Sequence, residues 1–200
     1  MGMLHLAQWI STAPHLTILN LTCCQLSHLA MECLWASLQT ATALTSLTLD
    51  KNGVTSSMAG IIPFLSENAS LTHLSLGMCG LGDDSVAHIG TALMTNTTLT
   101  SLSIPQNELT SQPWTGPLGN YVKLSTTLTK LDVSYNTNLT HSQEGLPLLH
   151  QIMMQNETLE ELELTVGNGA LNGGLIRFGD YAVEWLQHNL NLRYVSYPSN

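Results

Sequence analysis

The feature that most constrains this 200-residue chain is a leucine motif, L-x-x-L-x-L, that returns along its whole length. Six clear copies and one weaker copy begin 27 to 33 residues apart, at Leu16, Leu44, Leu71, Leu99, Leu128, Leu159 and Leu192. A period of this length is typical of repeat proteins, in which each unit buries its apolar face against its neighbours. The chain is therefore predicted to fold as a stack of similar units rather than around one central core.

Each unit divides into a short strand and a helix. In the L-x-L part, alternate side chains point to opposite sides, which is typical of a strand with one buried face. The following segment has a helical period, clearest at Val86, Ile89 and Leu93, which share one face of a helix. Units of this kind predict an α/β solenoid of about seven repeats, with parallel strands stacked in order along one face.

Two recurring polar positions are expected to stabilise the turns. The first stands three residues after the last apolar residue of a motif and is expected to form a structural ladder of Cys24, Asn52, Cys79, Asn107 and Asn136. A side chain there can pair buried backbone groups that the turns would otherwise leave without a partner. The second position precedes the strands, at Asn68, Asn96, Asn156 and Asn189. Asparagine tolerates the left-handed conformation that ends a helix, so we expect a helix stop there.

Together with the strand motif, the stretch LGDDSVAHIGTALMTNTTL, from Leu81 to Leu99, resembles ribonuclease-inhibitor-type leucine-rich repeats. Similar repeats occur in NOD-like-receptor-type sensors and in bacterial-effector-type proteins. The resemblance covers about Leu4 to Tyr197. It implies a curved solenoid, or horseshoe, with a concave parallel β-sheet and convex helices, which binds a partner protein on its concave sheet face. It does not identify that partner.

Three parts depart from the regular repeat within a single expected domain, residues 1–200. Residues 1–15 look like an N-terminal helical half-repeat without its strand, so we expect the chain to be a fragment or to dock end-on. Pro113 and Pro117 interrupt the fourth helix, because proline inside a helix costs about 3 kcal/mol, and Trp114 between them is expected to be exposed. Residues 165–180 are expected to form a glycine-rich insertion within the penultimate repeat.

Charge argues against nucleic acid and membrane as partners. The net charge is −9, and the five Lys and Arg residues are scattered, so no basic stripe exists to neutralise phosphates. No apolar run is long enough to cross a bilayer, and the first residues lack the basic and apolar regions of a secretory signal. We therefore expect a cytoplasmic protein, or one secreted into a host-cell cytosol if it is a bacterial effector.

The residue types that carry catalysis or metal binding are present but are not grouped. The eight histidines form no H-x-x-x-H pair, and the four cysteines match neither a zinc pattern nor a disulfide scaffold. The glycines from Gly167 to Gly174 lack the spacing of a nucleotide-binding turn. We expect no enzymatic activity, no metal, no cofactor, and four free thiols.

The residues between the strand leucines should stack into columns on the concave face. These columns are mostly small and neutral in the first repeats, whereas the later repeats carry charged and aromatic residues. Aromatic anchors dominate many protein interfaces. The expected protein-binding residues are therefore Lys130, Asp132, Tyr135, Glu161, Glu163 and Tyr194, together with His73 and Met78.

Two functions stay open beside a protein-recognition module from a bacterial effector or an innate-immune-type sensor. One is the substrate-recruiting domain of a larger enzyme such as a ubiquitin ligase, which a catalytic domain elsewhere in a longer parent protein would favour. The other is a structural spacer without a ligand, which a featureless concave surface would favour.

Overall fold

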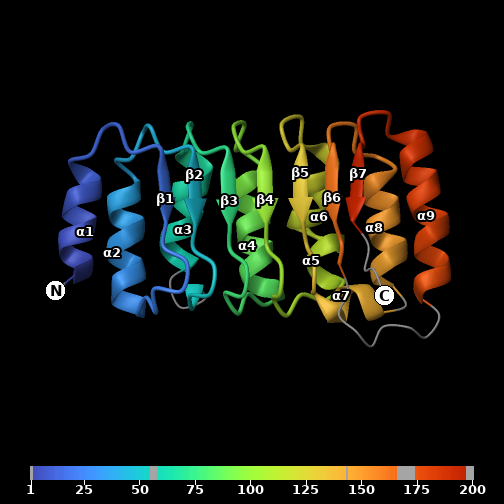
Figure 1. Ribbon diagram of the computed structural model, residues 1–200, viewed down its shortest axis with the longest axis horizontal. Coiled ribbons are helices and arrows are strands. Elements are labelled where there is room, and N and C mark those ends of the chain that lie inside the picture. Colours follow the sequence, from blue (N-terminus) through green and yellow to red (C-terminus); the bar gives the residue numbers. More distant parts are fainter. Residues whose placement is uncertain (1, 55–57, 143, 166–173, 197–200) are drawn as a thin grey trace.

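The computed structural model describes residues 2–54, 58–142, 144–165 and 174–196. Its strands form one seven-stranded parallel sheet in the order β1-β2-β3-β4-β5-β6-β7 (Figure 1). The strands are β1 (Ile18–Asn20), β2 (Ser46–Thr48), β3 (His73–Ser75), β4 (Ser101–Ser103), β5 (Lys130–Asp132), β6 (Glu161–Glu163) and β7 (Tyr194–Ser196). They coincide with the seven motif sites, so the parallel stack predicted from the repeat is confirmed.

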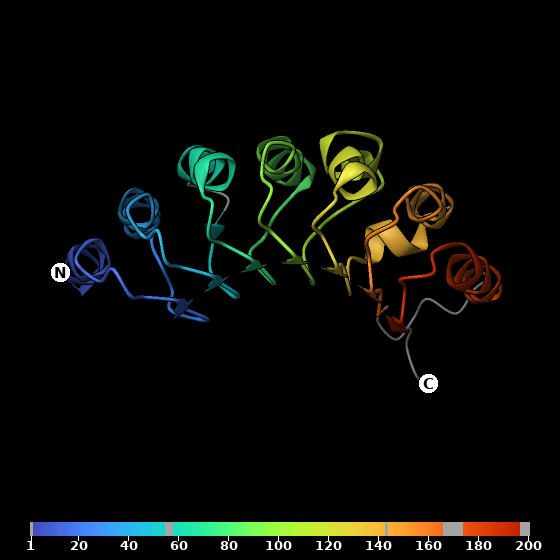
Figure 2. The same cartoon turned by 90° about the horizontal axis from the view of Figure 1, so that it is seen from above.

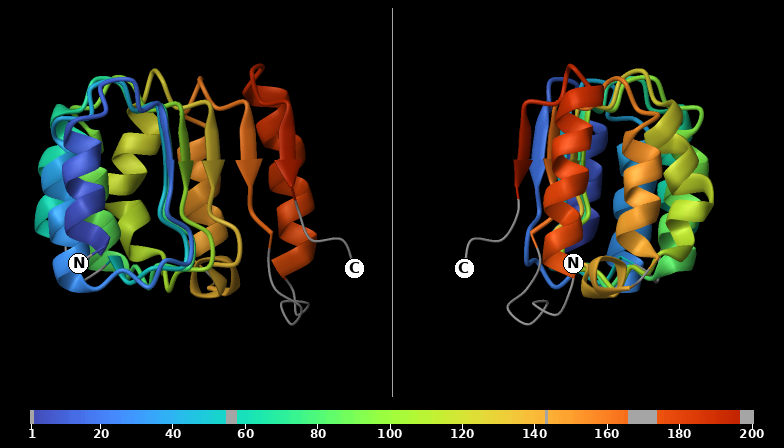
Figure 3. Two further views of the ribbon diagram at one scale, coloured as in Figure 1. Left: turned by 60° about the vertical axis from the view of Figure 1, so that its left-hand side comes forward. Right: turned by 90° about the vertical axis from the view of Figure 1, so that its right-hand side faces the viewer.

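Helices form a second layer that covers one face of the sheet (Figure 3). They are α1 (Gly2–Ser11), α2 (His28–Leu38), α3 (Met58–Glu67), α4 (Asp83–Leu93), α5 (Gln112–Thr115), α6 (Pro117–Leu124), α7 (Thr137–His141), α8 (Gly145–Met153) and α9 (Gly174–His188). A helix is about 10 Å across, whereas neighbouring strands lie about 4.8 Å apart, so stacked units fan outward on the helix side. Figure 2 shows the resulting arc, with the strands on its concave side and the helices on its convex side.

The alternation within each strand places the core between these two layers. The central leucine of each interior strand is at most 2% exposed, whereas its two neighbours are partly or fully exposed. The strand register stacks these leucines directly, from Leu47 through Leu74 and Leu102 to Leu131 and Leu162. Because burying one leucine contributes roughly 1.5–3 kcal/mol, this stack is a main source of stability. It also determines which side chains reach the concave surface.

Asn107 binds backbone groups on both sides of the turn that follows β4. Its side-chain nitrogen donates to the carbonyl oxygens of Leu76 and Ile104, at 3.0 and 3.1 Å. Its side-chain oxygen accepts from the N–H groups of Cys79 and Leu81, both at 3.0 Å. One buried amide therefore satisfies backbone groups in two successive repeats, which an apolar side chain could not do.

Asn52 and Asn136 bind turn carbonyls in the same way, and the Cys79 thiol donates to the carbonyl oxygen of Leu49 at 3.3 Å. The structure differs at Cys24, which is exposed instead of forming part of a buried ladder. In the described part of the chain no strand precedes β1. Cys24 consequently has no earlier turn against which to bury its thiol.

The asparagines that precede the strands form a second ladder. Asn96 donates to the carbonyl oxygens of Leu65 and Asn68 in the preceding repeat and accepts from the N–H of Leu99. Asn156 bridges two repeats in the same way, and both amides are buried. The expectation of left-handed helix stops was wrong, because the described non-glycine residues with positive φ lie elsewhere. A buried amide here satisfies backbone groups of two repeats rather than ending one helix.

The fourth repeat is irregular, as its prolines predict. Its helical half is split into α5, of four residues, and α6, of eight residues, with Gly116 between them. Trp114 is only 2% exposed, contrary to expectation, because α5 packs against α4, α6 and α8. Half of the glycine-rich insertion expected at residues 165–180, residues 166–173, lies outside the described residues, and from Gly174 on the structure has helix α9 in place of an insertion.

Candidate protein-binding surface

The concave face consists of the strand residues on either side of each central leucine. From β5 to β7 these positions bring together Lys130, Asp132, Glu161, Glu163 and Tyr194. In the strand register, Lys130 lies beside Glu161, Asp132 lies beside Glu163, and Glu161 lies beside Tyr194. Parallel strands are about 4.8 Å apart, so the five residues are contiguous. We call them the acidic patch.

Lys130 is held between two carboxylates within the acidic patch. Its Nζ lies 2.8 Å from Oε1 of Glu163 and 2.9 Å from Oε2 of Glu161. Hydrogen bonds to Glu163 and then to Glu161 raise the pKa of Lys130 above its usual range. The lysine therefore stays charged and fixes both glutamates. One cation against three carboxylates leaves the patch with an excess of negative charge.

Asp132 has a structural task in addition to its place in the acidic patch. One of its carboxylate oxygens accepts from the hydroxyl of Ser103 at 2.9 Å, and the other accepts from the N–H of Ser134 at 3.0 Å. These bonds tie β4 to β5 and hold the turn after β5. Glu161 and Glu163 are consequently the carboxylates better placed to meet a partner.

Two tyrosines flank the charged groups at different levels of the sheet. Tyr194 lies in β7 and is 50% exposed, and Tyr135 lies in the turn after β5 and is 42% exposed. The backbone N–H of Tyr135 donates to the carbonyl oxygen of Thr165, the residue that follows Leu164 beyond β6. Along the sheet, the turn that carries Tyr135 and the strand that carries Tyr194 therefore lie on either side of β6.

His73 and Met78 do not join the acidic patch. His73 is exposed in β3, with its Nδ1 2.7 Å from the hydroxyl oxygen of Thr72. Met78 is exposed in the turn that follows β3. Strand β4 separates both residues from β5. They belong to the neutral part of the concave face.

The sequence interpretation missed a row of residues in the left-handed conformation. One residue in each of five successive turns has a φ between 52° and 59°: Cys23, Lys51, Met78, Gln106 and Tyr135. This conformation costs an L-residue roughly 1–2 kcal/mol. In return, each N–H donates to a carbonyl oxygen of the next repeat, and each side chain is exposed. The sequence could have indicated this row, because each of these residues directly precedes a position of the structural ladder.

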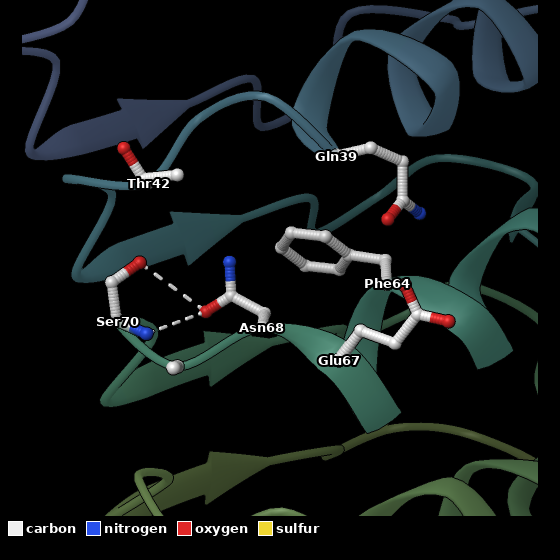
Figure 4. A pocket seen from close by; sticks show the side chains of 7 residues that line it. Gln39, Thr42, Phe64, Glu67, Asn68 and Ser70 are labelled. Atoms are coloured by element: carbon white, nitrogen blue, oxygen red, sulfur yellow. Dashed lines mark hydrogen bonds between the residues drawn. The ribbon is translucent and has the colours of Figure 1, made fainter.

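Two hollows on the helix side are smaller than an ordinary small-molecule site. A cavity of about 240 Å³ lies between the C-terminal ends of α2 and α3, lined by Gln39, Phe64 and Glu67 among others (Figure 4). A second, of about 130 Å³, lies between the ends of α4 and α6. Pockets for small ligands usually measure about 300–1,000 Å³. These two hollows therefore give no support for a small-molecule ligand.

The residues that the structure describes show neither a metal centre nor a membrane-spanning helix. Among them, no group of three or more His, Cys, Asp and Glu side chains could hold a metal ion. Within the same ranges, no helix is long and apolar enough to cross a membrane. The four cysteines are free thiols.

The parallel sheet, its leucine stack and the convex helices define a leucine-rich-repeat solenoid. Comparison with known proteins agrees. A family model described as "Leucine Rich repeat" matches residues 12–34, 67–90 and 124–141.

Curated relatives match nearly the whole chain. Proteins named "Capping protein, Arp2/3 and myosin-I linker protein 3" from rat, mouse and human are each 29% identical over 201 residues. The match covers 96% of this chain but only 14% of each relative. The chain therefore corresponds to a small part of those proteins.

Solved structures share the fold at lower identity. Actin-binding site 2 of leiomodin-1 has a TM-score of 0.53 and 15% identity, with 92% of this chain and 87% of that chain covered. The tropomodulin C-terminal domain of Caenorhabditis elegans has a TM-score of 0.54 and 11% identity, with 92% and 93% covered. At this level of identity the likeness concerns the fold alone.

Proposed function

We propose that this chain is a protein-recognition module whose acidic patch, together with Tyr135, binds a partner with a basic and partly apolar face. The observation that carries the proposal is the state of Lys130, whose charge is already engaged by Glu161 and Glu163. A partner therefore meets a preorganised surface with surplus negative charge and two exposed tyrosines. Charge of this kind speeds association, and aromatic anchors slow dissociation.

We infer that the partner belongs to the actin cytoskeleton and that the chain acts in the cytoplasm. Support comes from the names of the 29% identical relatives, which link them to capping protein, Arp2/3 and myosin-I. The same names favour this setting over a bacterial effector secreted into a host, an innate-immune-type sensor or the recruiting domain of a ubiquitin ligase. The alternation of strand and helix supports the resemblance to ribonuclease-inhibitor-type repeats.

We infer a binding role without catalysis. The charged groups of the acidic patch are engaged with one another, with the Ser103 hydroxyl or with the backbone, which suits recognition. Neither a nucleophile with an adjacent base nor a metal cluster is found among the described residues of this surface. The patch thus offers shape and charge rather than reactive groups.

The test measures binding of the purified chain to four probes: actin, capping protein, Arp2/3 complex and a myosin-I. We expect saturable binding to at least one, and we expect the double variant Glu161→Lys, Glu163→Lys to weaken it by about tenfold or more. Added salt should reduce the difference between variant and parent, because screening weakens the charge term.

The matched control is the double variant Ser46→Ala, Ser101→Ala on the neutral half of the concave face. Ser75 and Ser103 are less suitable, because their hydroxyls donate to Asp50 and Asp132. The site assignment fails if the control pair abolishes binding while the glutamate pair has no effect. Absence of binding to all four probes would reject the cytoskeletal setting.

A further inference from the structure

The larger of the two hollows on the helix side lies between α2 and α3 and has a volume of about 240 Å³ (Figure 4). Both helices lie inside the stack, with α1 before them and α4 after them (Figure 1). The hollow is smaller than the roughly 300–1,000 Å³ of pockets that enclose a whole small ligand. Its size instead suits a single side chain inserted by a partner.

Asn68, which lines this hollow, differs from the other asparagines that precede the strands. The side-chain nitrogens of Asn96, Asn156 and Asn189 each donate to a backbone carbonyl oxygen of the preceding repeat, at distances between 2.7 and 3.0 Å. Asn68 also uses its side-chain oxygen, which accepts from the N–H of Ser70 at 2.9 Å. Its side-chain nitrogen, however, has no hydrogen bond to a described residue. In Figure 4 this nitrogen points into the hollow.

Two further polar side chains around the hollow have unused hydrogen-bonding capacity. Glu67 is the last residue of α3, Gln39 directly follows α2, and both are exposed. Neither side chain makes a hydrogen bond or an ion pair with another residue in the described part of the chain. Figure 4 shows them extending toward each other beside Phe64. A ligand that displaces water here must therefore offer donors to Glu67 and Gln39 and an acceptor to Asn68.

Negative charge belongs to this hollow and not to the repeat. Glu67 stands four positions before a motif leucine, and it is the only acid at that place among the seven motif copies. The equivalent residues are Thr12, Thr40, Thr95, Leu124, Gln155 and His188. The second hollow, between α4 and α6, has Leu124 at this place, and the described residues that line it include no charged side chain. The repeat plan alone does not require a carboxylate at residue 67.

The unpaired groups favour a cation whose donors lie in one plane. Neither α2 nor α3 contains Lys or Arg. A guanidinium can donate two parallel bonds to the Glu67 carboxylate and a further bond to the Gln39 amide oxygen. An ammonium group lacks this fork of donors and is more strongly hydrated.

The floor of the hollow suits the apolar stem of an arginine. Phe64 is only 1% exposed and packs against Trp35, with 5.9 Å between the ring centroids. Long cationic side chains commonly place their methylene groups along apolar surface and keep their charge at the polar rim. Phe64 below and Glu67 at the rim offer this combination.

We propose that the hollow between α2 and α3 is a docking site for an arginine side chain of a partner protein. Glu67 and Gln39 accept from the guanidinium, Phe64 contacts the methylene stem, and Asn68 donates to a backbone carbonyl oxygen of the same partner. One arginine residue in a polypeptide thus supplies both the donors and the acceptor that the hollow lacks. The site lies among the convex helices, so it is separate from the acidic patch and goes beyond the proposed function.

The test records NMR spectra of the isotope-labelled full chain while N-acetylarginine N-methylamide, a blocked arginine residue, is added. We expect saturable shifts of the side-chain amide signals of Gln39 and Asn68, with a dissociation constant in the millimolar range. The blocked lysine residue should bind about threefold or more weakly. The blocked citrulline residue has nearly the shape of arginine but no charge, and it should bind about tenfold or more weakly.

Variants of the chain assign the binding to this hollow. Glu67→Gln should weaken binding of the blocked arginine by about fivefold or more, and Gln39→Ala by about threefold. The matched control is Glu157→Gln, which removes the same charge from an exposed carboxylate in the turn after α8. The double variant Glu161→Lys, Glu163→Lys should leave the shifts at Gln39 unchanged. This last result separates the hollow from the acidic patch. Circular dichroism establishes that each variant is folded.

Three results would overturn the proposal. The first is the absence of saturable shifts at Gln39 and Asn68 when the blocked arginine is added. The second is binding of the blocked lysine or citrulline as tight as that of arginine, which would remove the role of the guanidinium. The third is an equal loss in Glu67→Gln and Glu157→Gln, which would mean that the probe responds only to the net charge of the chain.

Discussion

The first four strands and the last three share one backbone plan but present different surfaces. Both parts stack buried leucines in register, and both use asparagine amides to bind the turns. On the concave face, β2 and β4 present Ser and Thr, whereas β5 and β6 present Lys, Asp and Glu. Stability and recognition therefore depend on different positions of the same repeat. A residue in a turn and a residue in a concave column should respond differently to substitution.

The largest expected effect on stability comes from removing a turn asparagine, a residue type that both parts of the sheet use. Asn107→Ala removes a side chain that satisfies backbone groups on both sides of its turn, including the N–H groups of Cys79 and Leu81. We expect the free energy of unfolding to fall by at least about 3 kcal/mol, because several buried groups lose their partners. Urea denaturation measures this change.

The matched control is Asn20→Ala on the concave face. Asn20 is exposed, and its side-chain oxygen accepts from the backbone N–H and the hydroxyl of its near neighbour Thr22. Its loss should cost less than about 1 kcal/mol. Equal losses at the two positions would contradict the separation of turn and surface.

An intermediate effect is expected for the thiols at two equivalent ladder positions, Cys24 and Cys79. Burial raises the pKa of the Cys79 thiol to about 11, so at neutral pH its thiolate is about a hundredfold scarcer than that of an ordinary cysteine. Cys24 is exposed. Mass spectrometry after limited alkylation should find Cys24 modified early and Cys79 modified only after denaturation. Rapid alkylation of Cys79 in the folded chain would contradict its buried position.

The repeat made the fold predictable, because a leucine every few residues at a fixed period leaves few alternatives to stacked strands. The members of the acidic patch were predictable for the same reason, since the register follows from the motif. Contacts between repeats were not. The burial of Trp114 depends on how the short α5 packs. The exposure of Cys24 depends on the absence of an earlier strand in the described chain. Neither property is local to the sequence around the residue.

The ion pairs of the acidic patch could not be predicted from the sequence either. Register alone places Lys130 beside Glu161, but the second bond, to Glu163, crosses diagonally to the other end of β6. The bond from Ser103 to Asp132 likewise depends on side-chain rotamers. The side-chain contacts therefore show which predicted binding residues also stabilise the sheet, such as Asp132, and which are more available to a partner, such as Glu161 and Glu163.

The smallest expected effect is a change in stability at one turn position that occurs in both parts of the sheet. Only in the second part should the same substitution also change binding. Lys51 and Tyr135 stand in equivalent turns with φ of 59° and 58°, one in each part of the sheet. Glycine adopts this conformation without steric cost, although it also gains freedom in the unfolded chain. Both Lys51→Gly and Tyr135→Gly should therefore raise the free energy of unfolding by about 0.5–1 kcal/mol, measured by denaturation. Only Tyr135→Gly should also weaken binding to the partner, by more than about 1 kcal/mol, because it removes an exposed aromatic anchor. If both variants weaken binding equally, the two parts of the concave face contribute alike; if Tyr135→Gly binds as the parent does, the tyrosine of the β5 turn lies outside the interface.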